Sequence, residues 1–197
     1  MTKASNTRHT ILEKAFDLIY KKGYQATSID EIIATTKVTK GAFYYHFKTK
    51  DDMGVAIINE IVKPNMHDAF IIPLQNSSKP VEDIYLMTKA LLLETPFLKL
   101  EYGCPASNLT QEMTPWNSKF SEALNELVLA WQTAVENSIK RGIEKGNITS
   151  AANPKQVALF IISGYWGIRN FGKVSHSTDC YYLYLEELKF YLKNLSQ

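Results

Sequence analysis

The segment covering residues 38–53, VTKGAFYYHFKTKDDM, gathers three lysines, four aromatic residues and one histidine before it turns acidic. Lysine ammonium groups donate hydrogen bonds to phosphate oxygens and to guanine O6 and N7, and polar aromatic side chains add contacts to a phosphate backbone. These residue types at this spacing therefore point to nucleic-acid binding.

The distribution of charge supports the same interpretation. Residues 1–50 hold nine Lys/Arg and four Asp/Glu, whereas the rest of the chain holds 13 Lys/Arg and 16 Asp/Glu, out of totals of 22 and 20. The overall net charge of +2 conceals this asymmetry. Excess positive charge in one part of a chain indicates an anionic partner for that part, with nucleic acid as the first candidate.

The sequence lacks the patterns that catalysis, a metal site or a disulfide framework requires. The two cysteines, Cys104 and Cys180, lie far apart, and the four histidines show no metal-ligand spacing. We also find no Gly-rich phosphate loop and no paired-carboxylate signature. We therefore predict a protein that is not an enzyme and has no catalytic residue, no metal and no cofactor.

Helical periodicity predicts three helices, joined by short turns, around the segment rich in lysine and aromatic residues. Apolar residues recur at helical spacing over residues 8–22, and Gly23 follows as a stop signal. Short helices then follow over residues 28–35 and 40–45. The cap residues that we expect for these helices and the next are Ser28 with Glu31 (or Thr27 with Asp30), Thr39, and Thr49 with Asp52.

The remainder of the chain keeps a helical period. The fourth helix is expected to stop or kink at Pro64, and residues 73–80 form a Pro/Ser/Asn-rich break. Further helices are predicted over residues 81–93, 106–113, 117–145 and 154–172, and over a last helix that Asp179 caps and that extends to Leu195. Because no segment alternates as a strand does, we predict an all-α fold.

The predicted helix over residues 40–45 has two different faces. Phe43 and, just beyond the helix, Phe47 are assigned to the core, whereas Lys40, Gly41 and Tyr44 lie on the other side. A helix-turn-helix uses this arrangement, because one face anchors the recognition helix and the other enters the major groove of DNA.

At this point the stretch SIDEIIATTKVTKGAFYYHFKTKDDM resembles the DNA-binding signature of TetR/AcrR-type transcriptional regulators. The resemblance implies base-reading roles for Lys40 to Ala42 and phosphate-contacting roles for Tyr44, His46 and Lys50. Two residues depart from the family pattern: Lys37 stands in the turn where glycine is usual, and Ala42 stands where a Thr or Ser hydroxyl is common. The DNA-binding candidates are Thr27, Ser28, Lys37, Thr39, Lys40, Gly41, Ala42, Tyr44, Tyr45, His46 and Lys50.

The resemblance also implies two domains with different functions. Residues 1–50 are expected to form a three-helix DNA-binding domain, and residues 51–197 a helical domain that binds an effector and forms a homodimer. We assign two features to the dimer: the small residues Ser163, Gly164 and Gly167, and an apolar stripe on the last helix. An intramolecular core seam is the alternative for both. The stripe comprises Tyr181, Leu185, Leu188, Tyr191, Leu192 and Leu195.

Many aromatic residues in the C-terminal part predict a small apolar or aromatic effector, and Arg169 hints at an anionic group on it. Core packing is the alternative for most of these rings. Cys104 is interpreted either as a small buried apolar residue or as a reactive thiol, which would make the protein an electrophile- or redox-sensing regulator. The ligand-binding candidates are Phe97, Tyr102, Cys104, Asn108, Met113, Trp116, Trp131, Tyr165, Trp166 and Arg169.

The resulting hypothesis is a ligand-responsive regulator, with repression favoured over activation. It binds a palindromic double-stranded DNA operator as a dimer and is released by its effector. An architectural DNA-binding protein without an effector is the alternative. No window of 18 apolar residues and no apolar leader occurs, so we expect a cytoplasmic protein with no membrane partner.

Overall fold

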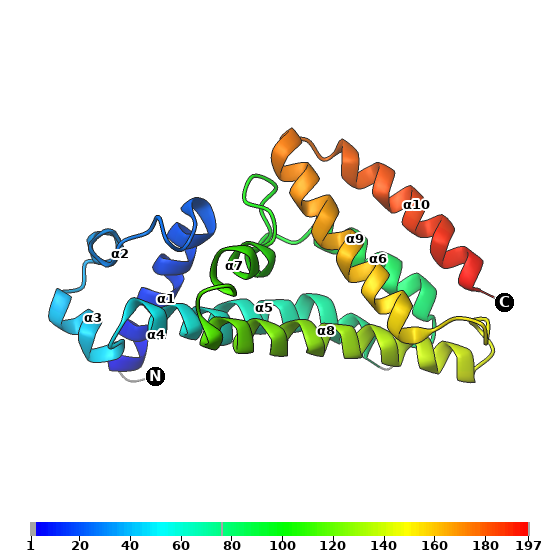
Figure 1. Cartoon of the computed structure of the whole chain (residues 1–197), viewed down its shortest axis with the longest axis horizontal. Helices are drawn as coiled ribbons and strands as arrows, with labels where there is room; N and C mark the ends of the chain where they lie inside the picture. The colour runs from blue at the N-terminus through cyan, green and yellow to red at the C-terminus, as the bar shows by residue number, and fades with distance from the viewer. Residues whose placement is uncertain (1–2, 76, 197) are drawn as a thin grey trace. The chain divides into compact units, whose positions relative to one another are not determined.

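The computed structural model describes residues 3–75 and 77–196, and the regular elements within them are helices (Figure 1). The predicted all-α class is therefore confirmed. The elements are α1 (Lys3–Lys22), α2 (Ile29–Thr36), α3 (Lys40–His46), α4 (Lys50–Ile57), η1 (Ile58–Val62), α5 (Lys63–Met66), η2 (His67–Ile71), η3 (Ile72–Leu74), α6 (Pro80–Leu93), α7 (Pro105–Met113), α8 (Ser118–Glu144), α9 (Pro154–Ser175) and α10 (Asp179–Leu195).

The chain divides into two compact units, and neither unit is continuous in sequence. Unit 1 comprises Met1–Pro64 and Pro105–Asn125, and unit 2 comprises Asn65–Cys104 and Glu126–Gln197. All of α7 and the first turns of α8 therefore pack with the N-terminal helices. This is notable because α7 follows α4 by more than 40 residues.

The core of unit 1 forms around α1. Its predicted inner face, Ile11, Leu12, Ala15, Phe16 and Ile19, is buried. This face packs against α2, α3 and α4, as the helical spacing predicted. The helix ends at Gly23, which has φ +96°, a left-handed conformation that glycine adopts without steric cost.

Side-chain caps start the next three helices where the sequence predicted them. Ser28 accepts from the Glu31 amide while the Glu31 carboxylate accepts from the Ser28 amide, which completes a capping box on α2. Thr39 and Thr49 cap α3 and α4 in the same manner. The alternative pair with Thr27 does not form, because the Thr27 hydroxyl is fully buried and donates to the Gly23 carbonyl.

Lys37, at the end of α2, has the left-handed conformation that its position in the turn predicted. Its φ is 57° and its ψ is 20°. A non-glycine residue in this region loses ~1 kcal/mol relative to glycine through contact between Cβ and the backbone. The Lys37 side chain is exposed, so burial does not offset this loss.

The helical backbone does not stop at Pro64. It continues from α4 through the π-helical η1, the short α5 that contains Pro64, the π-helical η2 and the 3-10 segment η3, ending at Leu74. Proline lacks the amide donor of a helical residue. The shift to i→i+5 bonding in η1, seen in the bond from the Lys63 amide to the Ile58 carbonyl, changes the hydrogen-bond register just before it.

The stripe on α10 is buried within the chain. Tyr181, Leu185, Leu188 and Leu192 are at most 3% exposed, and α10 packs against α6 and α9 of the same unit. For these residues the dimer assignment is wrong and the intramolecular seam is correct.

The end of α8 is followed by a turn and an isolated β-bridge between Ile148 and Ser196, next to the end of α10. None of the helices in the described part of the chain combines the length and hydropathy that a membrane span requires.

The α2 capping box predicts an acid-sensitive contribution to stability. Hydrogen bonds from Lys22 and from the Ser28 amide lower the pKa of Glu31 from 4.5 to about 2. A carboxyl whose pKa is lower in the folded state stabilises the protein above its unfolded pKa and loses that contribution as pH falls. Urea unfolding should therefore show Glu31→Gln less stable than the parent at pH 7, with the difference shrinking between pH 5 and pH 3. A difference that is constant with pH would contradict this assignment.

Candidate nucleic-acid interface

The recognition helix α3 has one buried and one exposed face. Phe43 and Phe47 are 0% and 3% exposed, which confirms their predicted place in the core. On the opposite side Thr39, Lys40, Gly41, Tyr44 and Tyr45 are exposed, and Ala42 and His46 are half-buried. The candidates on α3 thus share one accessible surface, and the two phenylalanines fix its orientation.

The Lys40 ammonium is available to a partner. It lies 3.2 Å from the Asp30 carboxylate of α2, but both side chains are well exposed. An exposed ion pair contributes only about 0–1 kcal/mol and is screened by salt, so DNA can replace Asp30. Tyr45, which is 79% exposed, packs its ring edge-to-face against His46 at 5.0 Å.

The start of α2 offers one exposed hydroxyl. Ser28 is exposed, whereas Thr27 is 0% exposed. Lys37 is exposed in the turn between α2 and α3. Ser28, Lys37 and the α3 candidates are therefore accessible, and Thr27 serves the packing of the α1–α2 turn instead.

Lys50 is engaged inside the protein. Its Nζ donates to the Tyr24 carbonyl at 2.6 Å and lies 4.3 Å from the centre of the Tyr24 ring. Burial lowers the pKa of the Lys50 ammonium, and the nearby Asp51 and Glu112 carboxylates oppose this shift. The sequence assigned Lys50 to phosphate contact, and in the structure its ammonium group already binds the α1–α2 turn.

Three residues that support this surface were missed or misinterpreted from the sequence. Arg8 is part of α1, pairs with Glu60 and stacks over the ring of Phe47, the C-cap of α3, at 4.9 Å. Glu112 of α7 contacts the turn that precedes the helix-turn-helix, and Asn117 of the α7–α8 turn contacts the first turn of α4, which follows it. No local pattern marks these two contacts, because their partners are 66 to 88 residues away in sequence.

The effector candidates fall into two groups. Trp131 and Tyr165 are buried in unit 2, where they and Phe70 pack edge-to-face with ring centres 4.5 to 5.5 Å apart. Phe97, Tyr102, Trp166 and the fully buried Cys104 also belong to unit 2. An open hollow of ≈ 200 Å³ in this unit is lined by other residues: Ile71, Leu74, Gln75, Ala130, Thr133, Ala134, Asn137 and Arg141.

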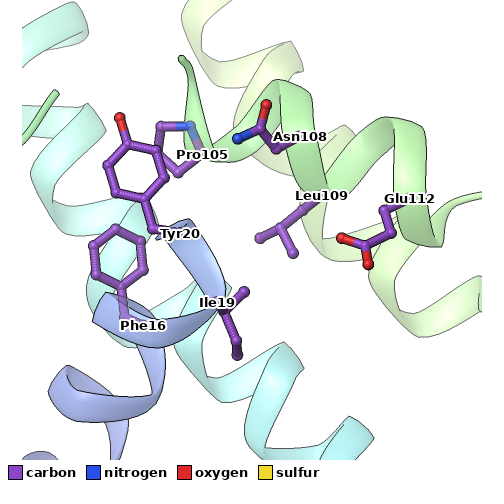
Figure 2. Close-up of a pocket in the computed structure, with 7 residues that line it drawn as sticks. All are labelled: Phe16, Ile19, Tyr20, Pro105, Asn108, Leu109 and Glu112. Atoms are coloured by element: carbon purple, nitrogen blue, oxygen red, sulfur yellow. The ribbon is translucent and has the colours of Figure 1, made fainter. Parts of the chain in front are cut away.

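The remaining candidates, Asn108, Met113 and Trp116, belong to unit 1. Asn108 borders a small hollow of ≈ 10 Å³ between α1 and α7, shown in Figure 2, which has room for about one water molecule. Met113 is buried and Trp116 is 79% exposed. The structure therefore does not bring these three residues into the aromatic cluster of unit 2.

Arg169 is buried and holds a loop in place. It is 1% exposed, and its Nη2 donates to the Lys99 carbonyl at 2.7 Å and to the Gly103 carbonyl at 2.6 Å. Its guanidinium also lies 5.7 Å from the centre of the Tyr181 ring. The guanidinium thus ties α9 to the segment that leads into α7.

Apolar side chains remain exposed on α9 and α10, apart from the buried stripe of α10. Gly164 belongs to the intramolecular seam, because a Cβ there would lie 2.6 Å from the Tyr184 hydroxyl of α10. Gly167, in contrast, has open space beside it. The exposed large apolar residues of these two helices are Leu159, Phe160, Phe171, Val174, Tyr182, Leu183 and Phe190.

Family profiles match most of the chain. The profile described as "Bacterial regulatory proteins, tetR family" matches residues 11–57. The profile described as "Tetracyclin repressor-like, C-terminal domain" matches residues 90–186.

Individual relatives agree with these profiles. An uncharacterized HTH-type transcriptional regulator from the lacX 3' region of Lactococcus lactis is 31% identical over 134 residues, which are 68% of each chain. The HTH-type transcriptional repressor DhaR of Mycobacterium sp. strain GP1 is 26% identical over 161 residues, or 81% of this chain and 79% of that protein.

Solved structures share the fold. A TetR transcriptional regulator from Chloroflexus aurantiacus superimposes with a TM-score of 0.90 at 22% identity, covering 100% of this chain and 98% of that one. The reduced form of NemR from Escherichia coli gives 0.81 at 22% identity, covering 97% of each chain. With a helix-turn-helix, matching profiles and these relatives, the chain belongs to the TetR family of bacterial transcriptional regulators and is a DNA-binding protein, not an enzyme.

Proposed function

We propose that this regulator binds a palindromic DNA operator as a homodimer and represses transcription until a small effector releases it. The observation that carries the proposal is the exposed polar face of α3, anchored by the buried Phe43 and Phe47. In this proposal Lys40, Gly41 and Ala42 face the bases. The contacts to the phosphate backbone or to the edges of the bases come from Ser28, Lys37, Thr39, Tyr44, Tyr45 and His46. Lys50 contributes mainly by holding the α1–α2 turn. In a secondary role, the positive charge of its ammonium group attracts DNA phosphate.

The proposed dimer uses the exposed apolar face of α9 and α10. That face carries Phe171, Val174 and Leu183, which are 69%, 80% and 68% exposed. Large apolar side chains at this exposure commonly mark an interface, and Gly167 leaves room for a neighbouring helix. A homodimer presents two recognition helices and thereby sets the spacing of two half-sites.

The proposed effector is apolar or aromatic and carries a hydrogen-bond acceptor. The Phe70, Trp131 and Tyr165 rings offer apolar contact area in unit 2. Among the described residues, the buried Trp131 Nε1 and Ser138 Oγ have no hydrogen-bond partner, and both lie on α8. Buried donors usually have partners, so a ligand acceptor would remove an unfavourable feature of this core.

Repression and release follow from linkage. An effector that binds one dimer geometry more tightly than the other shifts the population toward that geometry, and the two recognition helices then no longer match the operator. DhaR, a relative, is described as a repressor. Cys104 is fully buried, so the packing interpretation of this residue is favoured over the thiol-sensor alternative.

Lys40→Ala should weaken operator binding by about 1–3 kcal/mol and relax the base preference at one position of each half-site, because Lys40 is assigned to a base edge. The operator selected in vitro with the parent protein would be titrated by fluorescence anisotropy at fixed salt. Lys21→Ala is the matched control, because Lys21 is an exposed lysine at the end of α1. Unchanged affinity and unchanged base preference for Lys40→Ala would refute the assignment of α3.

Leu183→Glu should convert the dimer to a monomer, because it places a charge in the proposed interface, and the side chain is exposed within one chain. Light scattering after gel filtration would report the molar mass. Leu86→Glu, at a 49% exposed apolar position on α6, is the control and should remain dimeric. A Leu183→Glu protein that stays dimeric would place the interface elsewhere.

Trp131→Phe should reduce effector binding, because it removes the indole donor and part of the ring surface. Aromatic compounds would be screened by the rise in melting temperature, since a ligand at 100 times its Kd stabilises by about 2.7 kcal/mol. The shift should fall in Trp131→Phe and persist in the control Trp116→Phe, whose indole is 79% exposed. Equal shifts in both variants would move the effector site away from this cluster.

A further inference from the structure

One piece of the C-terminal family profile packs with the DNA-binding helices. Helix α7 lies inside the matched residues 90–186, yet it belongs to unit 1 together with α1 to α4. We propose that Glu112 on α7 is a positioning residue for operator recognition, whose carboxylate makes the geometry of the helix-turn-helix depend on the placement of α7. The inference rests on the DNA-binding part of the proposed function and on neither the effector nor the direction of regulation.

The Glu112 carboxylate bridges two successive backbone amides. Its Oε2 accepts from the Tyr24 amide at 2.8 Å, and its Oε1 accepts from the Gln25 amide at 2.6 Å. Both bonds are charge-assisted, and such bonds are about twice as strong as neutral ones. A Cβ at the preceding Gly23 would lie 3.4 Å from both carboxylate oxygens, an ordinary contact distance, so the carboxylate lies directly beside the turn.

Tyr24 passes this constraint to α4. Its carbonyl accepts from Lys50, its hydroxyl donates to Asp51 Oδ1 at 2.6 Å, and its ring packs edge-to-face against Phe120 at 5.0 Å. Lys50 and Asp51 form the first turn of α4, which begins three residues after the C-cap of α3 at Phe47. The turn held by Glu112 therefore also sets the helix that directly follows the recognition helix.

Asn117 provides a second bridge from the same segment. Its Nδ2 donates to Asp51 Oδ2 at 2.8 Å, and its Oδ1 accepts from the Lys119 amide at 3.1 Å and the Phe120 amide at 3.4 Å at the start of α8. Asp51 thus receives one hydrogen bond from the α1–α2 turn and one from the α7–α8 turn. The two bridges hold residues 24 and 25 of the α1–α2 turn and the start of α4 against α7 and the turn that follows it.

The chain connects α7 closely to a segment that Arg169 of α9 binds. Only Cys104 separates Gly103 from the first residue of α7, and Arg169 of α9 donates to the Gly103 carbonyl. A change that displaces Arg169 would therefore reach α7 through two peptide bonds. Without the Glu112 carboxylate, a displacement of α7 would move the α1–α2 turn less, because the two hydrogen bonds to the Tyr24 and Gln25 amides would be absent.

The simpler alternative is that Glu112 only adds stability. In that case its removal lowers the melting temperature but leaves the affinity of the folded protein for its operator unchanged. A positioning role predicts a loss of specific binding that non-specific binding does not share, because phosphate contacts tolerate a displaced recognition helix better than base contacts do.

The test compares Glu112→Gln with Glu122→Gln in the full-length dimer. Both substitutions remove one carboxylate from unit 1, and Glu122 is exposed on α8. The glutamine at position 112 also turns an amide donor toward a backbone donor. Operator affinity should fall about tenfold in Glu112→Gln, as expected for the loss of one charge-assisted hydrogen bond, and should not fall in Glu122→Gln. Binding to unrelated duplex should change equally in both.

Glu112→Asp is the second variant, in case the glutamine protein does not fold. It keeps the charge but shortens the side chain by one methylene, so it should also bind the operator more weakly than the parent. Parental operator affinity in the folded variants, with or without a lower melting temperature, would overturn the inference. A parent protein that selects no operator at all would instead overturn the proposed function.

Discussion

Tyr24 engages its amide, its carbonyl, its ring and its hydroxyl with three helices of unit 1, which are α7, α4 and α8. The residue is 3% exposed, and burial together with the Asp51 hydrogen bond raises the pKa of its hydroxyl, so the hydroxyl stays protonated and remains a donor. A buried polar network of this kind is stable only when its members are satisfied together. Through its carbonyl and its hydroxyl, Tyr24 links the α1–α2 turn to the start of α4, the helix that follows α3.

The sequence predicted several local interactions correctly, although the predicted cap of α10 was wrong, because Thr178 is the N-cap and Asp179 is the first helical residue. Caps at Ser28, Thr39 and Thr49 act over three residues, and the buried position of Phe43 follows from helical spacing. The left-handed backbone at Lys37 could be predicted because the family pattern places glycine there. Local chemistry thus determined the bounds of the short helices and the two faces of α3.

Long-range contacts could not be predicted in the same way. Lys50 was expected to contact phosphate, and nothing near it in sequence indicated its bond to the Tyr24 carbonyl, 26 residues earlier. Helical periodicity also identifies an apolar stripe without showing what covers it. On α10 the four residues Tyr181, Leu185, Leu188 and Leu192 cover the chain's own core, while Leu183 and Phe190 on the same helix remain exposed. A single sequence shows both sets of apolar residues on α10, but it does not indicate which set packs within the chain.

The composition of unit 1 limits how this protein can be treated as modular. A chimera that exchanges residues 1–50 for those of another regulator would keep α7 but give it a foreign α1–α2 turn, so that Glu112 would face the backbone amides of a turn that was not selected to match it. The exchange that preserves a whole packing unit carries residues 105–125 along with the N-terminal helices. Biosensors assembled from regulators of this kind would therefore be joined at two breakpoints in the C-terminal half as well as one near Pro64.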